Sequence, residues 1–158
     1  MKSLFTILCS LLISFSAFAQ NFENEVAVYQ SIYGMEKSII VEEIINLEET
    51  DSEVFWNLYN EYEGKRKELG QLRIELIANY AENYNDLTDE KMDELVNKTA
   101  KLNSELNKII LAYYQKIKKQ NNTKVAAQFY QLENFFLTEI RAAILEQIPF
   151  IDELKSEE

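Results

Sequence analysis

Residues 92–113, MDELVNKTAKLNSELNKIILAY, decide the fold. One side of this stretch repeats at alternating steps of three and four residues, through Met92, Leu95, Thr99, Leu102, Leu106, Ile109 and Tyr113. This spacing predicts a long helix with a narrow apolar seam, suited to an antiparallel hairpin with a second long helix.

The segments on either side of this stretch also have helical spacing. We predict helices over about 25–46, 51–85, 89–119 and 124–147, with Pro149 ending the last one. Only three glycines and one proline occur, and a fold of strands and tight turns needs more of these turn-forming residues. The prediction is therefore an all-α fold, an elongated four-helix array with long antiparallel hairpins. It either closes as a bundle or opens as a cradle, and the ratio of helix length to helix number favours the cradle.

Two short motifs are typical of helix starts. Thr50 and Glu53, which follow Leu47, have the form of a capping box. Leu87-Thr88 precedes two acidic residues, so Thr88 is expected to cap the next helix while Leu87 packs back on the array.

The N-terminal residues 1–19 have the pattern of a secretory signal peptide. Lys2 precedes an apolar run, and Ala17-Phe18-Ala19 is a small-x-small cleavage site, so Gln20 is the expected mature N-terminus. The run is too short to span a membrane. The expected product is a periplasmic protein with one helical domain over 20–158, frayed in its acidic tail 152–158, and with no stable membrane insertion.

Cysteine and histidine usage excludes several kinds of chemistry. Cys9 lies within the apolar run and is interpreted as part of the signal peptide; lipidation there is the alternative. The mature chain then has no cysteine, and the whole chain has no histidine. Disulfides, Ser-His-Asp triads and most zinc or copper sites are therefore excluded. We expect no catalytic residues, no cofactor and no metal.

The charge balance bears on partners. Without Lys2, the chain has 15 basic and 27 acidic residues, a net charge of 15 − 27 = −12. Such a surface argues against nucleic acid and anionic lipid as partners. Most of the carboxylate pairs lie at helix starts or on polar faces, where solvation is the default.

Four apolar residues lie beside the main stripes: Trp56, Tyr114, Phe135 and Leu137. They widen the apolar face of their helices. They are expected either to fill a wider core or a homodimer surface, or to line an exposed surface for client proteins.

The two helix-start motifs, together with the signal peptide and four helices, resemble the periplasmic Spy/CpxP-like family, whose LTxxQ motif occurs twice. The second copy stands here as Leu87-Thr88-Asp89-Glu90-Lys91, with lysine in place of glutamine. In the first copy Leu47 matches and Glu48 takes the threonine position. The resemblance implies a helical cradle, often a homodimer, that acts as an ATP-independent chaperone or a stress-sensing accessory protein.

The resulting functional hypothesis is a non-enzymatic periplasmic protein that binds unfolded or partner proteins through apolar patches. The alternative is an envelope-stress accessory protein that docks on a single partner. An enzyme that relies on carboxylates and tyrosines alone is the third and weakest hypothesis.

Overall fold

The computed structural model describes residues 37–45, 47 and 49–151. The chain divides between Ile40 and Val41, and the unit from Val41 onward is the one considered below. The expected signal peptide, its cleavage site at Ala17, Ala19 and Gln20, most of the first predicted helix and the tail 152–158 lie outside the described residues.

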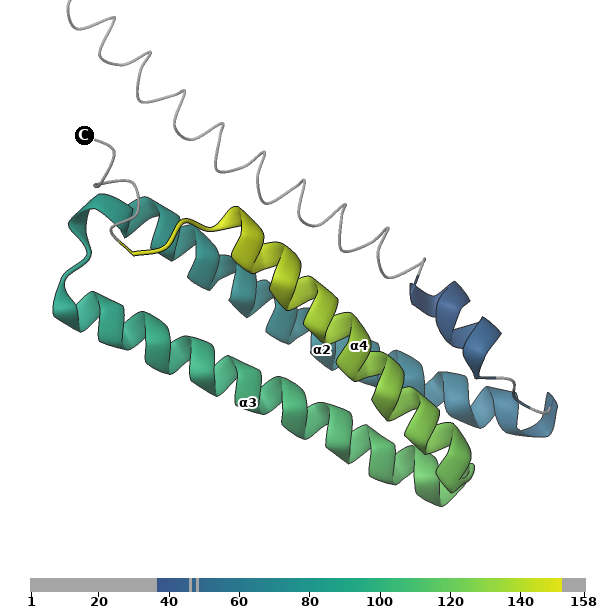
Figure 1. Cartoon of the computed structure of the whole chain (residues 1–158). Helices are drawn as coiled ribbons and strands as arrows, with labels where there is room; N and C mark the ends of the chain where they lie inside the picture. The colour runs from purple at the N-terminus through teal and green to yellow at the C-terminus, as the bar shows by residue number, and fades with distance from the viewer. Residues whose placement is uncertain (1–36, 46, 48, 152–158) are drawn as a thin grey trace, which may run out of the picture. The chain divides into compact units, whose positions relative to one another are not determined.

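The unit from Val41 is built from long helices, as Figure 1 shows. They are α2 (Glu49–Asn83), the short 3-10 helix η1 (Tyr84–Asp86), α3 (Asp89–Gln120) and α4 (Thr123–Gln147). α3 runs antiparallel to α2, and α4 returns parallel to α2. The described ranges contain no strand, and the predicted all-α array of long antiparallel hairpins is confirmed.

Side-chain caps define both turns. Thr88 is the N-cap residue of α3, and its Oγ1 accepts a hydrogen bond from the backbone N–H of Lys91 at 3.3 Å. Asn122 caps α4, and its Oδ1 accepts from the N–H of Val125 at 3.0 Å. α2 begins at Glu49, so Thr50 lies inside the first turn. The predicted start at about Asp51 is therefore two residues late, and the side-chain contacts of the expected capping box at Thr50 lie outside the described residues.

One half of the unit has a continuous core. This packed half comprises 51–68 of α2, 102–120 of α3 and 123–136 of α4. Its largest buried side chains are aromatic, and Tyr62 contacts Phe129 and Tyr113 at ring-centroid distances of 5.1 and 5.6 Å. Tyr59 also meets Phe129 edge-on at 6.3 Å. Large rings thus fill the space between three helices.

The other half has little core. This open half comprises 69–86, 87–101 and 137–151. Of the buried apolar residues in the described ranges, only Ile74 and Tyr84 belong to it. The first three turns of α3, up to Ala100, have no buried residue. The helices continue through this half, but most of their apolar side chains remain partly exposed to solvent.

The predicted seam of α3 is correct at Leu102, Leu106 and Tyr113, whereas its first three positions are not buried. In α3 the buried residues are Leu102, Leu106, Ile110, Tyr113 and Ile117, so Ile110 replaces the predicted Ile109. Thr99 is exposed. The four-residue step from Leu106 to Ile110 fits the 3.6-residue period of a straight helix, in which steps of four are more frequent than in a 3.5-residue heptad.

Candidate client-binding surface

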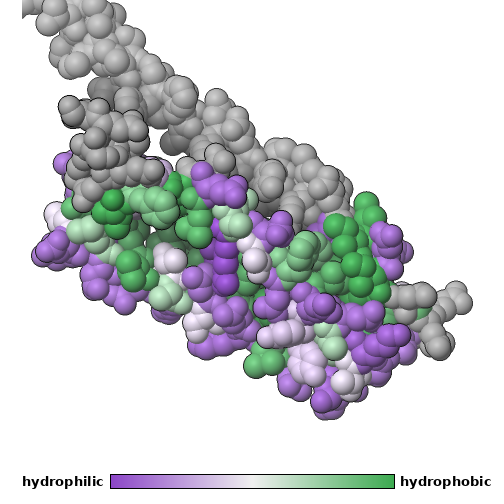
Figure 2. All heavy atoms as spheres, viewed as in Figure 1, coloured by the Kyte–Doolittle hydropathy of each residue, from purple (hydrophilic) through white to green (hydrophobic). Residues whose placement is uncertain are grey.

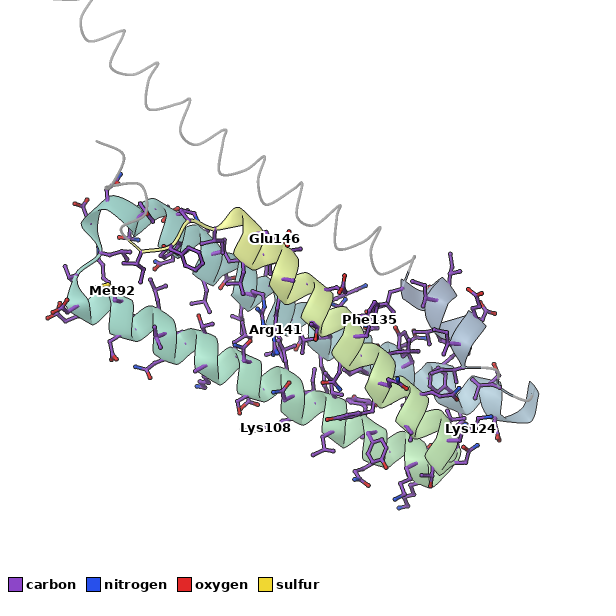
Figure 3. The ribbon with its side chains drawn as sticks, viewed as in Figure 1. Met92, Lys108, Lys124, Phe135, Arg141 and Glu146 are labelled. Carbon is purple, nitrogen blue, oxygen red and sulfur yellow. The ribbon has the colours of Figure 1, made fainter. Side chains whose placement is uncertain are left out.

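The two predicted binding residues on α4 lie at the border between the halves. The Phe135 side chain is 57% exposed, and its ring contacts Phe136 at 5.8 Å. Leu137 is half-buried. Figure 3 labels Phe135, which belongs to the middle of α4. Phe135 therefore offers an accessible ring held against a buried neighbour.

The two predicted binding residues on α2 and α3 are placed differently. Trp56 is half-buried and packs edge-on against Phe55 and Tyr59, both at 5.3 Å. Tyr114 is half-buried and meets Tyr130 of α4 at 5.9 Å. Both lie at the edge of the aromatic core. Within the described residues, no ring contact joins Trp56, Tyr114 and Phe135 to one another, so these residues do not form one cluster.

The open half carries the apolar residues that the sequence reasoning missed. They are large, at least 49% exposed, and distributed over α2, α3, α4 and the segment after α4: Leu72, Val96, Leu145, Phe150 and Ile151. Val96 directly follows Leu95 of the predicted seam, and Leu145 directly follows the half-buried Ile144. An apolar residue directly beside such a position is the sequence feature that could have identified them.

The face seen in Figure 2 shows how this apolar surface is distributed. Green patches are separated by purple hydrophilic side chains. No helix of the described residues has the length and apolar character needed to cross a membrane. On this face, hydrophobic patches are interrupted by hydrophilic side chains.

Two tyrosine hydroxyls, one from the end of α2 and one from η1, hold the segment after α4. Tyr80 donates to the carbonyl oxygen of Pro149 at 2.8 Å, and Tyr84 donates to that of Phe150 at 2.7 Å. The two rings meet edge-on at 5.6 Å. This double tether holds the exposed Phe150 side chain at the end of the open half.

A polar pair lies inside the packed half. Tyr62 donates a 2.6 Å hydrogen bond to Oε2 of Glu133, whose side chain is buried. Burial, then the charge of Glu133 and the hydrogen bond to it, raise the pKa of Tyr62 strongly. Arg66 lies nearby, and its positive charge acts in the opposite direction. Tyr62 thus stays protonated as the donor at neutral pH.

Arg66 itself is paired along α2. Its Nε and Nη2 donate to the two carboxylate oxygens of Glu63 at 2.9 and 3.0 Å. Burial alone lowers the pKa of Arg66, but the hydrogen bonds and charge of Glu63 outweigh it and raise that pKa. This is a two-pronged ion pair between side chains one turn apart on α2.

The described part of the chain contains no group of three or more His, Cys, Asp or Glu side chains placed to hold a metal ion. Comparison with protein-family models, with curated proteins and with solved structures found no match.

Proposed function

We propose that this protein is a non-enzymatic, ATP-independent, chaperone-like protein of the periplasm. It binds unfolded segments of other proteins through the apolar side chains of its open half and the adjoining Phe135. The signal-peptide pattern and the resemblance to the Spy/CpxP-like family support the compartment and the class.

The observation that carries the proposal is the contrast in burial along the same three helices. Leu145 is 66% exposed and Val96 is 63% exposed, although both belong to helices that bury an aromatic core further along. The free energy falls when another apolar segment covers exposed aliphatic side chains and removes them from water. Small patches separated by polar residues favour weak, transient contacts with many different segments.

An aggregation assay tests the proposal. Purified protein lacking residues 1–19 is mixed with reduced insulin, and light scattering is followed without nucleotide. We expect slower aggregation at several-fold excess of the protein. The variant Val96→Ser/Leu145→Ser should lose much of this effect while keeping the helical circular dichroism of the wild type.

A matched variant in the packed half provides the control. Leu111 and Tyr130 are 51% and 43% exposed, so Leu111→Ser/Tyr130→Ser removes similarly exposed apolar groups outside the open half. This control should suppress aggregation as the wild type does. Equal loss in both double variants would argue against a role specific to the open half. No suppression by the wild type would reject the chaperone proposal and leave an accessory protein for a single partner as the better hypothesis.

A further inference from the structure

Two guanidinium nitrogens of Arg141 on α4 are buried and have no hydrogen-bond acceptor in the described part of the chain. Its Nε and Nη2 have no hydrogen-bond partner among the described residues. These two groups lie on the same edge of the guanidinium, the edge that binds both oxygens of a carboxylate. Figure 3 labels Arg141 near the middle of the structure, on α4 beyond Phe135.

A second arginine lies close to Arg141. Arg73 of α2 donates from Nη2 to Oδ1 of Asn103 on α3 at 2.8 Å. Burial, and after it the positive charge of Arg141, lower the pKa of Arg73. Arg73 of α2 is thus hydrogen-bonded to a neutral amide of α3 and lies within electrostatic range of the positive charge of Arg141 on α4.

Arg66 shows how this chain neutralises a half-buried arginine. There the Nε and Nη2 edge is filled by both oxygens of Glu63. The chain has 27 acidic residues, yet no salt bridge within the described ranges joins Arg73 or Arg141 to any of them. Two neighbouring guanidinium groups without a carboxylate favour binding of an anion from outside.

The surroundings indicate what kind of anion fits. One helical turn from Arg141 lie Leu137 and Ile144, and one turn from Arg73 lie Leu69 and Leu76; all four are half-buried. A polyanion is disfavoured by the acidic surface of the chain. We propose that Arg141 and Arg73 bind the carboxylate of an aliphatic carboxylic acid, whose hydrocarbon chain contacts the half-buried leucines and isoleucine.

Binding of sodium octanoate tests the proposal, by calorimetry and by thermal unfolding. Sodium chloride and sodium sulfate at equal ionic strength are the reference salts. We expect saturable octanoate binding that raises the Tm, and a smaller effect of acetate. Equal effects of octanoate and chloride would overturn the proposal. A sulfate effect as large as that of octanoate would overturn the choice of a carboxylate.

Three variants locate the site. Arg141→Lys keeps the charge but removes the two-pronged edge, so octanoate affinity should fall by about tenfold or more, which corresponds to about 1.4 kcal/mol. Arg141→Met should unfold at a higher temperature than the wild type in chloride, because a buried unpaired charge is removed. Lys108→Gln changes an exposed charge on α3 and should bind octanoate as the wild type does.

The results separate a binding site from a structural role. If Arg141→Met lowers the Tm in chloride, the arginine supports the fold and the proposal fails. If Arg141→Lys binds octanoate as tightly as the wild type, the carboxylate does not use this edge and the proposal also fails.

Discussion

In the packed half, aromatic rings from α2, α3 and α4 contact one another, whereas in the open half the same helices present mainly aliphatic side chains and two arginines, with the ring pair of Tyr80 and Tyr84 at the far end. The border lies near Arg73 and Arg141. Beyond it, most leucines and isoleucines of the three helices are half-buried or exposed, and only Ile74 and Tyr84 are buried among the apolar residues described there. A helix can therefore continue for many turns after its core has ended.

The largest expected effect comes from removing a ring in the packed half. Phe129→Ala should lower the free energy of unfolding by about 3–5 kcal/mol, because Phe129 is buried between Tyr59 and Tyr62. Leu145→Ala in the open half should change it by only about 0.5 kcal/mol or less. Urea denaturation measures both. A loss of several kcal/mol for Leu145→Ala would show that the open half has a core in solution.

The buried polar pair should have the next largest effect. Tyr62→Phe removes the hydroxyl that donates to Glu133, and the loss of a donor to a buried carboxylate costs about 1–3 kcal/mol. Urea denaturation near pH 8 measures this cost. An unchanged stability would mean that another donor replaces the hydroxyl.

The same pair predicts a pH dependence with a definite sign. Folding raises the pKa of Tyr62 above its ordinary value of about 10, so its contribution to stability is present below that pH and is lost as the pH rises above it. Between about pH 9 and pH 11 the wild type should lose more stability than Tyr62→Phe. Identical pH profiles of the two proteins would contradict the raised pKa.

The two helix caps give the smallest and best-matched comparison. Thr88→Ala, at the turn of the open half, and Asn122→Ala, at the turn of the packed half, should each lower stability by about 1 kcal/mol. Equal losses indicate that the two halves unfold together. A loss for Asn122→Ala alone would mean that the open half unfolds before the rest.

Much of the fold follows from local sequence rules. The bounds of α3 and α4 agree with prediction within a residue or so, because capping residues and apolar periodicity act over a few positions. The cap at Thr88 was predictable for the same reason. The start of α2 was not, since Glu49 and Thr50 suit a helix as well as they suit a turn.

The arrangement at the candidate sites depends on contacts between distant helices. Arg73 follows Leu72 and Arg141 follows Ile140, so each arginine has an apolar neighbour, but no spacing shows that α2 and α4 bring them together. The buried position of Glu133 is likewise hidden, because its donor is 71 positions away in the chain. Trp56 meets rings of its own helix, at positions one before and three after it, whereas the contact of Tyr114 with Tyr130 joins α3 to α4 and is not visible in the sequence.

The tether between α2 and the segment after α4 also bears on the order of folding. Tyr80 and Tyr84 reach acceptors 69 and 66 positions further along the chain. The hairpin of α2 and α3 needs only contacts across one short turn and so is able to form first, whereas contacts over such long separations form slowly. During synthesis from the N-terminus, this last fastening has to wait until Pro149 and Phe150 have emerged. Until then the tyrosine end of α2 has no cover, and the newly made chain itself exposes the kind of surface that a chaperone recognises.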